Sequence, residues 1–486
     1  MKKTNVPVVT LAIFMTTFMT AIEGTIVSTA MPTIVSDLDG LEIMNWVVSI
    51  FLLMTAVSTP LYGKLADSIG RKPVFLFGIA LFVIGSSLCG LAQNMVELIL
   101  FRVIQGLGSG AVQPVAITII ADLYTLQKRA KMLGLNSGFW GVASVIAPLL
   151  GGFIVQHLSW HWVFYINVPI GIIAFLLVLI YLREPKHKSS SKLDLQGTVW
   201  LVLLLLALMF FLQDLGSSTN MLVMAALAVL IVVSVILFFR AEKRAADPIM
   251  PLSMLKDKEF FALNIITLLI SGVVIGFEFY TPTWMQGING TNASLAGFAV
   301  TPSSLMWIVG SFLIGGMLGR WGIKKTYDYM LAILVAADLV LILVPIYTPF
   351  WVFCIVAAFN GTAFGAITTA SQVRSQVLVP KDDIGVATSF NTLMKYLGQT
   401  MMVSIYGIAF NTMVAKGLAK HPGLTQEMMN KIVSAENAKT LASNVVPQLR
   451  QILLGGLKAV YVVSMIVIII SILLNQTYKD RKIINK

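Results

Sequence analysis

Ionisable residues stand inside long apolar runs of this sequence, at Glu23, Arg102, Glu278, Asp338 and Lys395. Placing a charged side chain at the centre of a bilayer costs at least about 2.5 kcal/mol, so such residues usually mark a functional path or a buried pair. A carboxyl group in a partly dehydrated site takes up a proton readily, and its ionised form attracts a cation. Glu23 and Glu278 could therefore exchange a proton for a cationic ligand without any use of ATP. A purely structural pairing is the alternative for Glu278.

Asp338 and Lys395 fall near the middle of their apolar runs. A buried acid and a buried base lower each other's cost when they lie together. We therefore expect these two residues to form a structural pair, with a direct functional role as the alternative.

The composition indicates a membrane protein. Of 486 residues, 57% are hydrophobic and 12% are charged, which is too apolar for a soluble chain of this length. The sequence has two Cys without a CxxC spacing, no HExxH motif and no G-x-x-x-x-G-K-[ST] loop. We therefore expect no enzyme activity, no metal site and no cofactor.

Fourteen stretches approach the roughly 20 apolar residues that a helix needs to cross a bilayer. They lie at residues 8–32, 45–66, 74–92, 96–123, 133–156, 162–182, 195–213, 221–239, 260–283, 295–318, 329–346, 350–378, 386–412 and 458–475. The first stretch lacks a convincing cleavage site and should be retained. Lys and Arg gather in alternate loops, which predicts that both termini are cytoplasmic. The net charge of +12 then marks the cytoplasmic face and not a nucleic-acid-binding surface.

The seventh and eighth stretches carry no charge and divide six preceding stretches from six that follow. This pattern predicts a six-helix bundle at 1–183, an inserted two-helix hairpin with cytoplasmic linkers at 184–258, and a second six-helix bundle at 259–486. An extracellular loop at 413–457 mixes charges with spaced apolar residues, so we expect short amphipathic helices there.

The loop after the second stretch reads "GKLADSIGRKPV". Its glycines permit a tight turn between two helix ends, and Asp67 and Arg71 can pair across those ends. The alternative is a solvated basic loop.

This loop closely resembles the signature loop of the major facilitator superfamily. Four further stretches resemble motifs of its drug/proton antiporter branch with fourteen helices: "AIEGTIVSTAMP", "LILFRVIQGLGSG", "GVASVIAPLLGG" and "SWHWVFYINVPIG". Two positions depart from the branch, since Glu23 replaces its usual aspartate and Ala147 replaces a glycine. "GGMLGRWGIKK" looks like a decayed second copy of the signature loop, without an acid equivalent to Asp67.

The resemblance implies an all-α integral membrane protein with the major facilitator fold. Twelve core helices would form two bundles around a central cavity, with alternating access and the hairpin inserted between them. Helices one, four, nine and twelve would line the cavity. Polar and aromatic residues on these helices are the expected substrate contacts: Gln105, Ser109, Gln113, Ser271, Phe277, Tyr280, Asn360, Phe364 and Thr368. Hydrogen bonding between helices and ordinary packing are the alternatives.

The resemblance also implies roles for single residues. Arg102 would transfer protons or balance charge, with a structural counter-ion as the alternative. Gly63, Asp67, Arg71 and Asp122 would form a cytoplasmic gate in which Asp122 pairs with Arg71. The antiporter helix would allow close packing through its glycines and bending at its proline: Gly138, Gly141, Pro148, Gly151 and Gly152.

These features together predict a proton-coupled multidrug efflux antiporter that exports small lipophilic or cationic drugs by alternating access. We expect it in the bilayer of a bacterial cell membrane, functional as a monomer and driven by the proton gradient alone. One alternative is an exporter of an endogenous metabolite, a lipid or a tetracycline-type metal complex on the same fold. The other is a membrane sensor or channel that does not transport.

Overall fold

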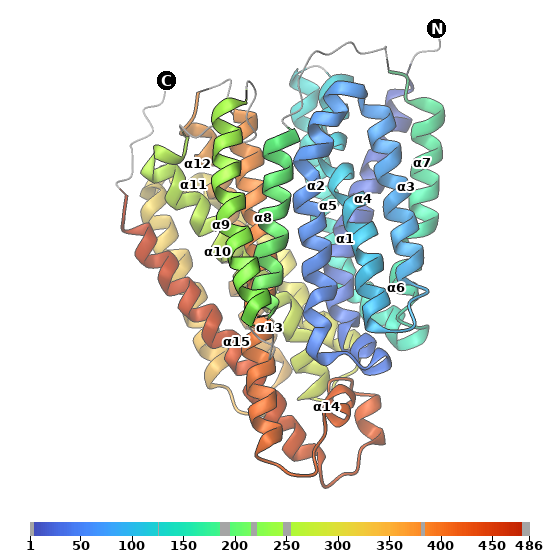
Figure 1. The fold of residues 1–486 in the computed structure, drawn as a ribbon, viewed down its shortest axis with the longest axis vertical. Helices are drawn as coiled ribbons and strands as arrows, with labels where there is room; N and C mark the ends of the chain where they lie inside the picture. The colour runs from blue at the N-terminus through green and yellow to red at the C-terminus, as the bar shows by residue number, and fades with distance from the viewer. Residues whose placement is uncertain are drawn as a thin grey trace. The chain divides into compact units, whose positions relative to one another are not determined.

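The structure is a computed structural model that describes residues 4–124, 126–184, 195–214, 221–245, 254–380 and 384–478. Every regular element within these ranges is a helix (Figure 1). The chain forms two compact units, Met1–Leu208 with Val229–Pro248, and Met209–Ala228 with Ile249–Lys486. The predicted boundaries at 1–183, 184–258 and 259–486 stay a prediction.

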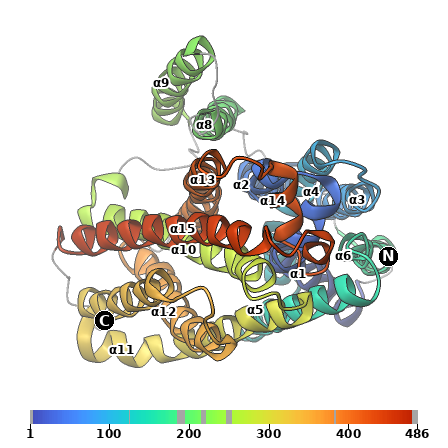
Figure 2. The ribbon, with the colours of Figure 1, turned by 90° about the horizontal axis from the view of Figure 1, so that it is seen from below.

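The first unit contains the helices that carry Glu23 and Arg102. In chain order they are α1 (Val6–Leu38), η1 (Leu41–Ile43), α2 (Met44–Ile69), α3 (Arg71–Cys89), α4 (Met95–Leu123), α5 (Leu126–His157), α6 (Trp162–Tyr165) and α7 (Asn167–Tyr181). Side chains cap two of these helices, because Asn5 accepts from the backbone of α1 and Asn94 from that of α4. α8 (Leu195–Asp214) and α9 (Met221–Arg244) follow and lie side by side (Figure 2).

The second unit contains the helices that carry Glu278, Asp338 and Lys395. They are η2 (Met254–Lys256), α10 (Lys258–Gly287), α11 (Ala293–Leu343), α12 (Phe350–Val377), α13 (Ile384–Ala419), α14 (Gln426–Ile432), η4 (Asn437–Thr440) and α15 (Val446–Asn475). α11 is interrupted at Gly322, whose φ of 73° and ψ of 175° are not helical. Gly70, with a φ of 102°, makes the corresponding turn between α2 and α3, so the decayed loop copy keeps the glycine of the signature turn.

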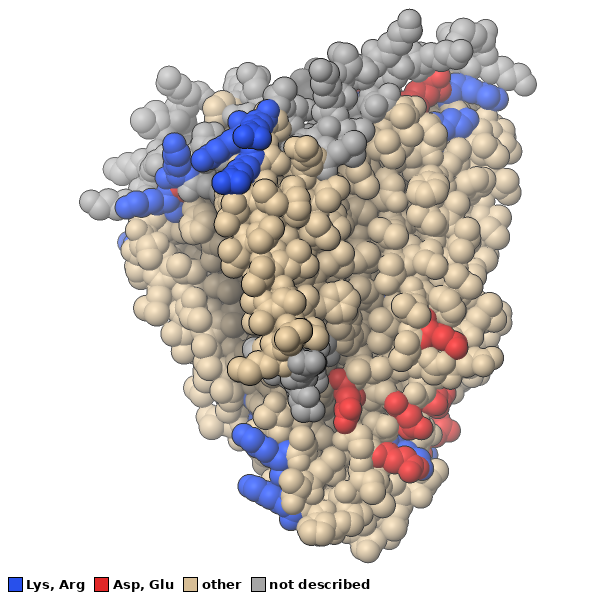
Figure 3. Space-filling model, viewed as in Figure 1, with Lys and Arg blue, Asp and Glu red and all other residues tan. Residues whose placement is uncertain are grey.

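Each of the fourteen predicted stretches overlaps a helix of the structure. Within the described ranges, twelve helices are long and apolar enough to cross a membrane. The apolar segments at Gly141–His157 and Gln196–Leu208 are shorter, so a count of fourteen membrane spans stays a prediction. On the face drawn in Figure 3, charged side chains gather toward the helix ends and leave a broad uncharged band. This is the surface of an integral membrane protein.

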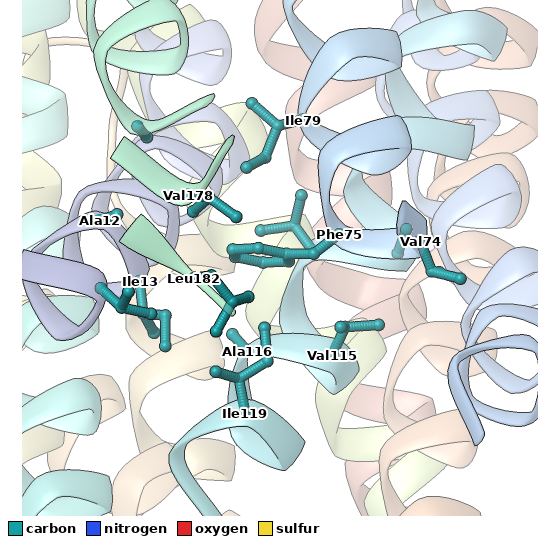
Figure 4. Close-up of a cluster of buried hydrophobic side chains, with 14 of the residues drawn as sticks. Ala12, Ile13, Val74, Phe75, Ile79, Val115, Ala116, Ile119, Val178 and Leu182 are labelled. Atoms are coloured by element: carbon teal, nitrogen blue, oxygen red, sulfur yellow. The ribbon is translucent and has the colours of Figure 1, made fainter. Parts of the chain in front are cut away.

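The core of the first unit joins α1, α2, α3, α4 and α7. Ile13, Phe75, Ile119 and Val178 are among its buried side chains and point toward one another (Figure 4). Lipid tails are as apolar as these residues, so close packing stabilises the bundle more than removal from water does. That packing fixes the relative positions of the helices that hold the polar residues described below.

Candidate functional site

Glu23 lies on α1, inside the first unit, and its side chain is 0% exposed. Arg102 on α4 forms an ion pair with it, since Nη1 donates to Glu23 Oε1. Asn167 at the start of α7 donates from Nδ2 to Glu23 Oε2 over 2.6 Å. The two oxygens of one carboxylate are therefore held by donors from two other helices.

Arg102 is also held by groups that carry no charge. Its Nε donates to Val47 O over 3.0 Å, and its Nη1 donates to Gln105 Oε1 over 2.7 Å. The guanidinium carbon lies 4.3 Å from the ring centroid of Phe51, which is a cation–π distance. Glu23 is the ion-pair partner of Arg102, so the geometry accords with a charge-balancing role.

Hydrogen bonds extend the cluster from α1 and α4 to α3. Ser86 Oγ accepts from Gln105 Nε2 over 3.1 Å and from Asn167 Nδ2 over 3.0 Å. The same hydroxyl donates to Phe164 O over 2.9 Å. We call Glu23, Arg102, Gln105, Ser86 and Asn167 the buried polar cluster; all five side chains are buried.

Ser86 and Asn167 were not among the site residues predicted from the sequence. Asn167 is one of the polar residues within "SWHWVFYINVPIG", and its place among apolar neighbours was the available signal. Ser86 could be reached only through the packing of α3 on α4. A Cβ added at Gly85 would lie 2.6 Å from Gln105 Cα, so this glycine permits the close approach that brings Ser86 and Gln105 together.

The predicted cytoplasmic gate is described in part. Arg71 forms an ion pair with Asp122 at the end of α4, as the sequence predicted. Gly63 lies within α2 and is half-buried. Asp67 also lies in α2, but its side chain is outside the described residues, so its pairing stays a prediction.

Next to this gate, α3 and α7 cap each other. Glu184 accepts from the backbone N–H of Arg71 over 2.8 Å and of Lys72 over 2.9 Å, which places a carboxylate on the N-terminus of α3. Lys72 Nζ donates to Leu179 O and Leu182 O, each over 2.7 Å, which places an ammonium on the C-terminus of α7. Glu184 was not among the site residues predicted from the sequence. These contacts hold the ends of α3 and α7 together.

The predicted antiporter helix is α5, and Gly138, Gly141, Pro148, Gly151 and Gly152 lie within it. α5 packs against α1. A Cβ added at Gly151 would lie 2.8 Å from Ile26 Cγ1 and 3.1 Å from Ile26 O, so Gly151 permits close contact with the helix that carries Glu23.

In the second unit, Glu278 on α10 and Lys395 on α13 are half-buried and close enough for their charges to interact. Lys395 Nζ also lies 5.7 Å from the ring centroid of Trp307. Glu278 therefore has a basic neighbour, like Glu23 in the first unit.

The predicted pair of Asp338 and Lys395 stays a prediction, and the structure shows other neighbours for each residue. Asp338 on α11 is 2% exposed and lies near Ser464, Tyr406 and Tyr461 of α15 and α13. Lys395 on α13 lies near Glu278, since α13 also packs against α10. In the described part of the chain, one Asp338 oxygen and the Tyr406 hydroxyl have no hydrogen-bond partner.

Most of the remaining predicted substrate contacts are buried. Ser109, Ser271, Phe277, Tyr280, Asn360 and Phe364 are buried, whereas Gln113 and Thr368 are half-buried. Neither the oxygen nor the nitrogen of the Asn360 amide has a hydrogen-bond partner among the described residues, and neither has the Ser271 hydroxyl. Asn360 and Ser271 therefore keep polar groups that a substrate or water could use.

Toward the start of α10, polar residues form bonds between helices. Asn391 Nδ2 donates to Asn264 Oδ1 over 3.0 Å and to Ser371 Oγ over 2.9 Å. Arg374 Nε donates to Glu259 Oε1 over 2.7 Å in a buried ion pair that sequence analysis missed. These bonds join α10, α12 and α13, and hydrogen bonding between helices was one of the alternatives for the polar residues of the predicted cavity helices.

Residues 13–403 match a family model described as Major Facilitator Superfamily. The chain is 37% identical over 417 residues to Multidrug resistance protein 3 of Bacillus subtilis (strain 168), a match that covers 84% of this chain and 80% of the relative. It is 33% identical over 501 residues to Multidrug transporter protein MdtP of the same organism, covering 96% and 92%. Multidrug efflux pump SdrM of Staphylococcus aureus (strain N315) is 30% identical over 406 residues, covering 82% and 89%.

Among solved structures, the chain is similar to a bacterial homolog of the human lysosomal transporter Spinster in an inward-facing and occupied conformation. The TM-score is 0.70 with 18% identity, covering 98% of this chain and 97% of that one. At this identity the likeness concerns the fold alone.

Proposed function

Because the chain belongs to the Major Facilitator Superfamily, we propose that it is a proton-coupled multidrug efflux antiporter that exports lipophilic, cationic compounds by alternating access. Three similar relatives are named as a multidrug resistance protein, a multidrug transporter and a multidrug efflux pump, which supports export of many drugs. The observation that supports proton coupling is the ion pair of Glu23 and Arg102, buried without solvent contact within the first unit.

The ion pair changes its net charge when it takes up a proton. Ionised Glu23 and Arg102 sum to zero, whereas protonated Glu23 leaves one positive charge in a dry site. Charges interact strongly where the effective dielectric constant is low, so the protonated pair repels a cationic drug nearby and the ionised pair tolerates it. Proton and drug then exclude each other through the charge of the pair, without the drug having to touch Glu23.

Glu278 is the proposed second coupling residue. Its half-buried carboxylate lies close to Lys395, so it also belongs to an acid and base that can sum to zero. Trp307, near Lys395, offers an aromatic face, and the amide of Asn360, which has no hydrogen-bond partner among the described residues, offers a polar group on the same unit. These groups suit lipophilic compounds that carry a charge or a polar group.

We further propose that the protein works as a monomer in a bacterial cell membrane, with both termini cytoplasmic and the proton gradient as its energy source. The clustering of Lys and Arg in alternate loops supports this orientation. The mechanism needs no ATP and no cofactor, since the ionisable groups carry the proton.

The test is efflux by purified protein in proteoliposomes under an imposed pH gradient, across cations, zwitterions and anions. We expect gradient-driven efflux of several unrelated lipophilic cations and its loss in Glu23→Gln. Glu97→Gln is the matched control, because Glu97 caps α4 in the same unit without contact to the ion pair. An efflux rate that is the same with and without the pH gradient would contradict proton coupling. Efflux of only one of the tested compounds would favour a metabolite exporter.

A further inference from the structure

Among the described residues, the side-chain nitrogen of Asn167 has hydrogen-bond partners and its side-chain oxygen has none. Its Nδ2 donates to Glu23 Oε2 over 2.6 Å and to Ser86 Oγ over 3.0 Å. Its Oδ1 has no hydrogen-bond partner in the part of the chain that the structure describes, although the residue is only 1% exposed. Buried polar atoms are nearly always paired, so an exception calls for a physical reason.

The chemistry of a carboxyl group supplies that reason. An ionised carboxylate only accepts hydrogen bonds, whereas a protonated carboxyl group also donates one. A neighbour that donates a hydrogen bond to the ionised form and accepts one from the protonated form can therefore stabilise both states of a group that exchanges protons. Among side chains, a primary amide offers both functions at two ends of a rotatable plane.

No other member of the buried polar cluster can accept the proton of Glu23 as readily. Arg102 has donors only. Gln105 uses both ends of its amide, because Oε1 accepts from Arg102 and Nε2 donates to Ser86. Cys89 is the other titratable group at the cluster, and its thiol donates weakly to Gln105 Oε1 over 3.7 Å. Asn167 Oδ1 is the acceptor that remains.

We propose that Asn167 is the positioning residue for the proton carried by Glu23. Its Nδ2 donates to the ionised carboxylate. When a proton binds Glu23 Oε2, the amide turns by half a rotation and Oδ1 accepts from the new hydroxyl. This role rests on the proposed function, in which Glu23 gains and loses a proton during transport.

The rotation has a consequence for α6 and α7. With Oδ1 in the place of Nδ2, Asn167 no longer donates to Ser86, whose hydroxyl can turn and donate to Oδ1 instead. Ser86 then releases Phe164 O, the carbonyl to which it now donates in α6. Protonation of a residue on α1 would thereby change the contacts at the start of the sixth predicted membrane span.

The first test is the pH profile of efflux by Asn167→Leu in proteoliposomes. Donation to a charged acceptor stabilises more than a bond to a neutral group, so loss of the amide disfavours ionised Glu23 more than protonated Glu23. We expect the pH of half-maximal efflux to rise by about one unit, a tenfold change in proton affinity. A merely structural tie would lower efflux equally at every pH and leave that midpoint unchanged, which would overturn the inference.

Asn136→Leu is the matched control. Asn136 on α5 also binds α1 through its amide, since Oδ1 accepts from Thr17 over 2.8 Å, but it does not touch Glu23. We expect Asn136→Leu to keep the wild-type midpoint. An equal shift of the midpoint in both variants would mean that loss of any amide contact to α1 changes the pH of half-maximal efflux. That result would overturn a special role for Asn167.

A second readout does not depend on transport. Infrared spectra of the purified protein across pH should show a carboxylic-acid carbonyl band that Glu23→Gln removes and that Asn167→Gln moves in frequency, since the amide then meets the carboxyl group differently. If the Glu23 band keeps its wild-type frequency in Asn167→Gln, the inference is overturned while the proposed function stays intact. No Glu23 titration and no pH-dependent efflux in the wild type would instead defeat the proposed function.

Discussion

Replacing Arg102 by leucine should make the stability of the protein depend on pH in a way that reports the charge of Glu23. Arg102 is the residue that forms an ion pair with Glu23, and the two side chains are 1% and 0% exposed. Removing one partner of a buried pair typically costs about 3–5 kcal/mol, because the other charge stays in a dry site. In Arg102→Leu, however, Glu23 can avoid that cost by binding a proton.

The magnitude follows from the cost of protonating a carboxyl group. A glutamate in water has an ordinary pKa of about 4.3, so holding it protonated at pH 7 costs about 3.7 kcal/mol, and at pH 5 about 1 kcal/mol. The folded variant keeps a proton that the unfolded chain releases above about pH 4.3. Stability therefore falls as pH rises, by roughly 1.4 kcal/mol per unit and about 2.7 kcal/mol from pH 5 to pH 7.

The assay is thermal unfolding of purified protein in detergent at pH 5, 6 and 7, at one scan rate. The reference is the double variant Arg102→Leu/Glu23→Gln, which lacks both charges but keeps every other titrating group. We expect the single variant to lose apparent stability relative to the double variant as the pH rises. The same pH dependence in both variants would refute the reasoning, because Glu23 would then not be the group that takes up the proton.

Three further changes test other contacts. Glu184→Gln weakens the cap on α3, so we expect a loss of about 0.3–1 kcal/mol in stability by thermal unfolding; an unchanged unfolding temperature would show that the cap contributes nothing. Gly151→Leu should impair efflux, because even a Cβ there would lie 2.8 Å from Ile26 Cγ1; normal efflux would show that α1 and α5 need no close contact. Asp338→Asn should fold and transport nearly as the wild type while Asp338→Lys fails to fold, since Asp338 is 2% exposed and burying a neutral amide costs far less than burying an unpaired ammonium; expression and gel filtration check this, and loss of efflux by the folded Asn variant would assign Asp338 a role in coupling.

The membrane helices, and the two residues of the central ion pair, could be identified from the sequence. Long apolar runs predict membrane helices directly, and a charge inside such a run is costly enough to single out Glu23 and Arg102. The resemblance to motifs of the first and fourth helices then pointed to the helices whose residues form the pair.

The sequence could not predict which of the other charged residues lie near one another. Asp338 and Glu278 are acids on different helices, and either could pair with Lys395 at similar depth. The choice depends on which helices pack together and how each is rotated about its axis. Because α11 is apolar on most sides, its sequence period does not indicate which face carries Asp338 toward α15.

Asn167 and Glu184 were missed for a related reason. Neither stands out by type, since an asparagine near a helix start and a glutamate just after a helix are common at membrane boundaries. Their significance comes from partners far away in the chain, at Glu23 for Asn167 and at the backbone of Arg71 and Lys72 for Glu184. Such contacts follow from the packing of α7 on α1 and α3, which local patterns do not encode.

The most direct measurement of the central claim is proton release when a lipophilic cation binds purified protein in weakly buffered detergent solution. If the charge of the Glu23 and Arg102 pair excludes proton and drug from each other, drug binding should release protons from the wild type. Release should fall in Glu23→Gln and persist in Glu97→Gln. Equal release by the wild type and Glu23→Gln would contradict the account, because the exchanged proton would then come from another residue.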